Sequence, residues 1–193
     1  EVVNSLIALT IREIGEMGPA IMTRVWKTIG RVPEAIDIVL ACMLERAVPA
    51  TSKSSPIGSK NMQTLEDIAI TLAAENPSFV SGKLVHNLLR LLEDTRHDQA
   101  ETLVDHRSWI AIEIYLRWLL MLSFDNLLAV ELYLPELFHI VMMVFYTGNS
   151  LVRATTHRLF INIVHCIYTT HLCHESKQQA LRFHLYEYQQ LPF

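Results

Sequence analysis

Apolar residues recur at helical spacing along almost the whole chain. They return every three or four positions, and no segment alternates regularly between apolar and polar side chains. This spacing is typical of amphipathic helices, whereas a half-buried strand requires a period of two. The sequence therefore predicts an all-α fold. The predicted helices cover about 1–15, 20–29, 33–46, 62–75, 77–93, 106–123, 135–146, 151–172 and 176–190, with a short further helix after Asn126.

Proline, glycine and small polar residues mark the expected ends of these helices. Pro33 and Pro77 suit the first position of a helix, where the missing N–H costs nothing, and Asn76 can cap the helix that Pro77 begins. Gly148 is expected to end one helix, and Ser150 can cap the next. These signals place most of the predicted boundaries.

Two loops and one further break separate the helices. Residues 47–60 are rich in Pro, Ser, Gly and Lys without an apolar period, and residues 94–105 are mostly charged or polar. Ser176 and Gln179 have the spacing of a capping box, which predicts a separate last helix. We therefore expect loops at 47–60 and 94–105 and a turn between the last two helices.

From residue 20 onward the predicted helices form antiparallel pairs. The pairs are 20–29 with 33–46, 62–75 with 77–93, 106–123 with 135–146, and 151–172 with 176–190. Their period of about 40 residues is the size of a HEAT or armadillo unit. We predict that residues 1–193 form a single helical-repeat segment of a larger protein, a HEAT/armadillo-like helical-hairpin solenoid. The repeats differ in sequence, so a globular helical bundle is the alternative.

The helix predicted at 106–123 is apolar on all sides except at Glu113 and Arg117, which are four positions apart and can pair. Such a helix is buried on most sides or lies against a partner. Its apolar run is shorter than the roughly 20 residues that a membrane-spanning helix needs, and Pro135 interrupts the next candidate. We therefore predict no membrane span.

Composition and charge narrow the classes of function. Hydrophobic residues make up 51% of the chain and charged residues 19%, which suggests that other protein surfaces cover part of it. The net charge of −4 argues against nucleic-acid binding, because phosphate contacts need a basic surface. Three cysteines do not make a disulfide framework and favour a reducing compartment. We predict a cytoplasmic protein.

One segment concentrates side chains that can bind metals, namely His165, Cys166, His171, Cys173 and His174. Thiolate and imidazole are the ligands that zinc prefers. Structural zinc sites usually hold paired ligands around a loop, whereas these residues fall mostly within one predicted helix. We expect core and surface residues here and no metal or cofactor, with a zinc-dependent domain as the alternative from the enzyme class.

No other motif indicates catalysis. Ser81, Gly82 and Lys83 are similar to the end of a phosphate-binding loop, but Pro77 and Leu84 stand where that pattern requires Gly and Ser or Thr. No predicted strand precedes them. The chain also lacks the nucleophile elbow and the zinc-protease motif. We therefore predict that this segment is not an enzyme.

Two predicted helices carry polar stripes that could bind a partner. The stripe on helix 77–93 is Lys83, His86, Asn87 and Arg90, and the stripe on helix 151–172 is Arg158, Asn162, His165 and Thr169. In a stacked array we expect both stripes on the concave face, which such arrays use for binding. A solvated helix face would show the same pattern.

The loop at 47–60 contains a candidate modification site. Ser55 precedes Pro56 in a stretch that is predicted to be exposed. This is the context of proline-directed phosphorylation, which would add negative charge to the loop. The alternative is a plain connector.

Several stretches together suggest a family. They are VWKTIGRVPEAIDIVL (25–40), EDIAITLAAENPSFVSGKLVHNLL (66–89), MLSFDN (121–126), LPELFHIV (134–141) and VRATTHRLFINIVHCIY (152–168). In this order they resemble the helical-repeat region of neurofibromin-type Ras GTPase-activating proteins, with most likeness to fungal members. The resemblance covers most of the chain.

The resemblance implies a HEAT/armadillo array that follows the catalytic domain and its lipid-binding, pleckstrin-like module. The family's arginine finger and Phe-Leu-Arg motif are absent here, so no catalytic residue is assigned. The parent protein would restrain Ras signalling, contact Ras only through its catalytic domain, and self-associate through its helical arrays. It would reach membranes only peripherally, through its other parts. We expect this segment to be a scaffold that packs against neighbouring repeats, self-associates or binds partners; a free-standing helical adaptor is the alternative.

Overall fold

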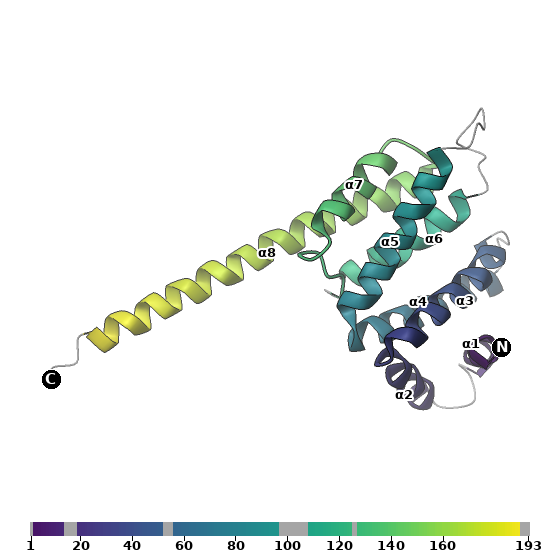
Figure 1. Cartoon of the computed structure of the whole chain (residues 1–193), viewed down its shortest axis with the longest axis horizontal. Helices are drawn as coiled ribbons and strands as arrows, with labels where there is room; N and C mark the ends of the chain where they lie inside the picture. Colours follow the sequence, from purple (N-terminus) through teal and green to yellow (C-terminus); the bar gives the residue numbers. More distant parts are fainter. Residues whose placement is uncertain (1, 14–18, 52–55, 97–107, 125–126, 190–193) are drawn as a thin grey trace.

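The computed structural model describes residues 2–13, 19–51, 56–96, 108–124 and 127–189, and within these ranges it contains helices and turns but no strand. The helices are α1 (Val2–Glu13), α2 (Pro19–Gly30), α3 (Pro33–Thr51), α4 (Pro56–Glu75), α5 (Pro77–Arg96), α6 (Trp109–Phe124), α7 (Leu134–Val144) and α8 (Ser150–Gln189) (Figure 1). The predicted all-α fold is confirmed.

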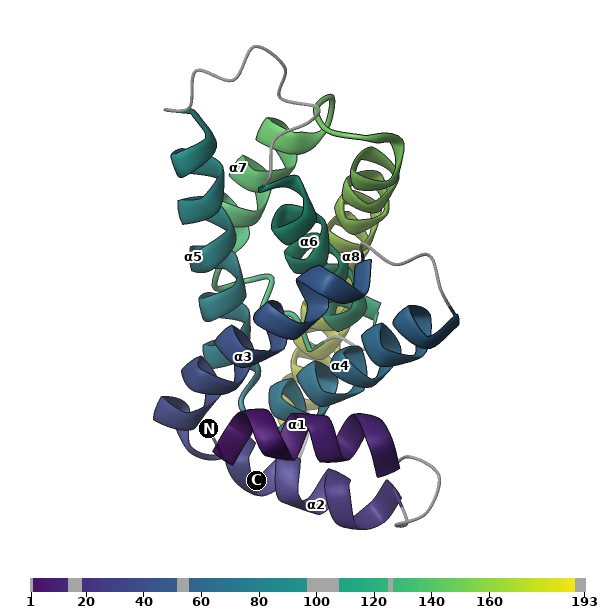
Figure 2. The same ribbon diagram turned by 90° about the vertical axis from the view of Figure 1, so that its right-hand side faces the viewer.

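The helices pack in two layers. In one layer α2 contacts α4, α4 contacts α6 and α6 contacts α8; in the other α1 contacts α3, α3 contacts α5 and α5 contacts α7. Consecutive helices such as α3 and α4, or α7 and α8, join the layers. Figure 2 shows α5 and α7 on one side of the body and α4 and α8 on the other. Apart from α1 with α4 and α3 with α6, the extensive contacts join helices one or two places apart in the chain.

Helix α6 lies at the centre of this arrangement. It contacts α3, α4, α5 and α8, and most of its side chains are buried. Trp118 is fully buried, and its ring meets that of Tyr115 edge-on with 5.8 Å between centroids. Neighbours on every side confirm the expectation that a helix with apolar residues all round is a core helix.

Several predicted helix ends are confirmed, and one cap differs. Pro33 and Pro77 begin α3 and α5, and the Asn76 Oδ1 accepts a hydrogen bond from the Phe79 N–H at 3.4 Å. At the start of α8 the capping side chain is Asn149 rather than Ser150, because Asn149 Oδ1 accepts from the Val152 N–H at 2.8 Å. The amide side chain, one residue earlier, is the one that reaches the first turn.

The predicted loops are too long. Helix α3 continues to Thr51 and α4 begins at Pro56, so most of 47–60 is helical, and α5 extends to Arg96. The physical reason is visible at Ala47, which is fully buried, and at Val48, which packs against the core. Buried apolar contacts continue the helix although Pro49 lies within its last turn.

The predicted helix after Asn126 is wrong. Residues 127–133 form turns in the structure. Leu128 and Val130 are buried there, and the N–H groups of Leu127 and Leu128 donate to the Leu122 carbonyl. The segment therefore caps the end of α6 and places Leu128 and Val130 in the core.

The predicted break near residue 172 is also wrong. Helix α8 runs without interruption from Ser150 to Gln189, and its second half extends beyond the rest of the body in Figure 1. No glycine or proline occurs between residues 150 and 190, so nothing in the backbone forces the helix to stop. Consequently 151–172 and 176–190 do not pair, and α6 packs chiefly against α8 rather than α7.

Candidate interaction surface

Large apolar side chains are exposed along two neighbouring helices. They are Phe138, Met142 and Tyr146, on α7 and just past its end, and Ile161, Val164 and Tyr168 on α8. Because each set is spaced by three or four residues, it follows one side of its helix. Met142 is 74% exposed and Tyr146 83%. We call these six residues the α7–α8 apolar face.

Aromatic contacts hold the two sides of this face together. The ring of Phe160 on α8 meets Phe138 edge-on at 6.0 Å and Phe145 at 6.1 Å between centroids. The His157 imidazole stacks on Phe145 at 4.0 Å, with 17° between the planes. Such pairs stabilise a fixed relative position of the helices. The exposed side chains are therefore presented on an ordered support.

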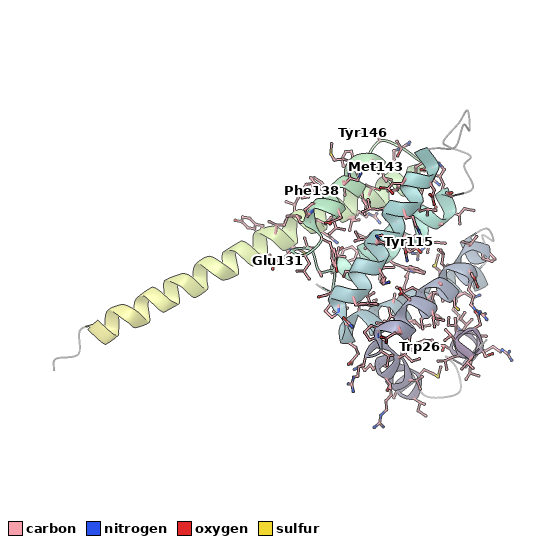
Figure 3. All side chains as sticks on the ribbon, in the orientation of Figure 1. Trp26, Tyr115, Glu131, Phe138, Met143 and Tyr146 are labelled. Atoms are coloured by element: carbon pink, nitrogen blue, oxygen red, sulfur yellow. The ribbon has the colours of Figure 1, made fainter. Side chains whose placement is uncertain are left out.

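Arginine and histidine outnumber acidic residues between residues 134 and 169. Between residues 134 and 169 the sequence contains one acidic residue, Glu136, which is partly buried. The exposed cationic or titratable residues in the same range are His139, Arg153, His157, Arg158 and His165. We call these five residues the basic rim. Glu131, three residues before α7, is also exposed and is labelled below Phe138 in Figure 3.

The predicted stripe on α5 is partly engaged within the molecule. Lys83 Nζ forms an ion pair with Asp37 Oδ2 of α3 at 2.6 Å and lies 5.3 Å from the centroid of the Phe79 ring. Asn87 forms a side-chain hydrogen bond with Tyr115 of α6. His86 and Arg90 are exposed. Only these last two side chains are fully presented to a partner.

Tyr115 shows how closely this stripe is coupled to the core. Burial raises the pKa of the Tyr115 hydroxyl above its usual value of 10.0, while the charge of Arg90 and the hydrogen bond with Asn87 act in the opposite direction. The phenol is therefore neutral at physiological pH. It acts as a buried polar contact between α5 and α6.

The predicted stripe on α8 is divided in the same way. Asn162 Nδ2 donates to Ser123 Oγ of α6 at 3.0 Å, and Thr169 donates to the carbonyls of His165 and Cys166 in its own helix. Arg158 and His165 are exposed. Helices α5 and α8 lie in different layers and share no extensive contact. The structure therefore does not bring the two stripes together on one face.

The described part of the His- and Cys-rich segment forms no metal site. His165 is exposed, and burial raises the pKa of the Cys166 thiol, which keeps it protonated. Among the described side chains, no three His, Cys, Asp or Glu residues are placed to hold a metal ion. The side chains of His171, Cys173 and His174 lie outside the described residues, as does Ser55.

The Ser-Gly pair that is similar to a phosphate-binding loop has a packing role. Ser81 is buried, and its Oγ accepts a hydrogen bond from the Ala129 N–H at 3.1 Å and donates to the Leu127 carbonyl at 3.4 Å. A Cβ at position 82 would collide with the hydroxyl of Tyr133, so glycine permits that close approach. The pair fixes the turn after α6 onto α5.

Replacing Ser81 by Ala should lower the free energy of unfolding by about 1–2 kcal/mol, because a buried N–H and a buried carbonyl lose their partner. Urea denaturation followed by circular dichroism would measure the change. Ser78→Ala is the matched control: Ser78 is exposed, and only its backbone carbonyl is used, by the Tyr133 hydroxyl at 3.1 Å. Equal effects of the two substitutions would contradict the assigned role of Ser81.

A buried ion pair connects α4 with α6. Glu66 is only 5% exposed, and its Oε1 pairs with Arg117 Nε. Burial raises the pKa of the Glu66 carboxyl above 4.5, and the Arg117 charge partly offsets this rise. Arg117 thus pairs with Glu66 of α4, whereas its spacing from Glu113 had suggested a pair within its own helix. A buried carboxylate without a cation costs more free energy than an exposed one, which favours the pair with Glu66.

The α7–α8 apolar face was not among the sequence-based site predictions. Its residues have helical spacing, but α7 and α8 are also rich in buried apolar residues such as Ile140 and Leu159. Periodicity shows that a side chain lies on one face of a helix and does not show whether another helix covers that face. The one sequence feature that could have indicated an exposed face here is the composition of residues 134–169, where arginine and histidine occur among apolar residues with a single acidic residue.

Within the described ranges, no helix combines the length and hydropathy that crossing a bilayer requires. No protein-family model matches this chain.

Proposed function

We propose that this chain is a non-catalytic, HEAT/armadillo-like scaffold segment of a neurofibromin-like Ras GTPase-activating protein. The observation that carries the proposal is the pattern of helix contacts. In stacked helical repeats each unit touches mainly its neighbours, and here the extensive contacts join helices one or two places apart, with two exceptions. The ordered likeness of five sequence stretches to that family adds the link to Ras.

The described side chains support a binding role over a catalytic one. The buried Glu66 is paired with Arg117 across α4 and α6, so among the described side chains it has a structural partner. Exposed features are instead the α7–α8 apolar face and its basic rim. Large exposed apolar patches mark interaction surfaces or neighbouring units of a larger assembly. A scaffold that supports a catalytic domain elsewhere in the parent protein, self-associates and binds partners fits both features.

The proposal predicts that GTPase stimulation belongs to the parent protein and not to this 193-residue chain. The polypeptide encoded by the complete gene should accelerate GTP hydrolysis by Ras, whereas the 193-residue chain alone should give no acceleration, because it contains neither the arginine finger nor the motif that steadies it. Single-turnover GTP hydrolysis would measure both. Deleting residues 1–193 from the parent protein should leave its stimulation of GTP hydrolysis unchanged and should reduce its self-association in sedimentation experiments.

Two results would contradict the proposal. A complete gene product without GTPase stimulation would favour a free-standing helical adaptor. Stoichiometric zinc in the purified chain, measured by elemental analysis, would favour the zinc-dependent alternative centred on residues 165–174.

A further inference from the structure

We draw no further inference here: the strongest candidate, the α7–α8 apolar face on the exposed sides of those two helices, carries none because nothing in the structure shows what covers it.

Discussion

Trp118→Ala should lower the free energy of unfolding by about 3–5 kcal/mol, the range for removing a large aromatic side chain from a core. Trp118 is fully buried in α6, and its ring packs edge-on against Tyr115. The substitution would leave a cavity beside α6. Because α6 contacts helices of both layers, this cavity would weaken the packing between the layers. Urea denaturation followed by circular dichroism would measure the change.

Trp118→Phe gives a more specific test of the same site. The Trp118 Nε1–H is buried and has no hydrogen-bond partner within the described part of the chain. Phenylalanine keeps most of the ring contacts and removes this unsatisfied donor, so the loss should be only about 1 kcal/mol. Ile21→Ala, on the exposed side of α2, should change stability by less than about 0.5 kcal/mol. A loss below 1 kcal/mol for Trp118→Ala would contradict the central position of α6.

Arg117→Met should be the second most damaging of these substitutions, with a loss of about 2 kcal/mol at pH 7. The variant leaves the Glu66 carboxylate buried without its cation. Breaking a fully buried pair costs about 3–5 kcal/mol, and the lower value applies here because the Arg117 side chain is 45% exposed. Arg24→Met, at an exposed position on α2, is the control and should be neutral.

The loss should depend on pH with a defined sign. The pKa of Glu66 in the folded protein is raised above 4.5, chiefly by burial, and removing Arg117 raises it further. A carboxyl with a raised folded-state pKa contributes most stability below its unfolded pKa, and this contribution is lost as pH rises through the folded pKa. The Arg117→Met deficit should therefore shrink as the pH is lowered from 7 toward 5. Adding Glu66→Gln should remove that pH dependence, and a deficit that is constant with pH would refute this account.

The sequence predicted the positions of the helices better than the contacts between them. Starts at Pro33 and Pro77 and the cap at Asn76 were correct because they depend on one residue and its immediate neighbours. The predicted loop at 47–60 was wrong because Ala47 is buried in the core. This burial continues α3 to Thr51 although the local sequence favours a loop. The break near residue 172 was wrong because a capping box permits a helix start and does not require one.

The predicted site residues show the same division. Spacing correctly placed Lys83, His86, Asn87 and Arg90 on one side of a helix, and it could not show that Asp37 and Tyr115 would come within reach of two of them. Such partners are contributed by α3 and α6, whose positions depend on the packing of the whole core. The same reason explains why Arg117 pairs with Glu66 and not within its own helix.

By itself the sequence determined that this protein is all-helical, that α6 is buried, and where prolines and Asn76 start helices, because these properties follow from local periodicity and backbone chemistry. The tertiary structure decided which apolar side chains remain uncovered and which charges meet. Whether Met142 or Ile161 is core or surface depends on the presence of another helix above it, and periodicity along one helix contains no information about that neighbour. The α7–α8 apolar face therefore emerged only from the packing of the two layers.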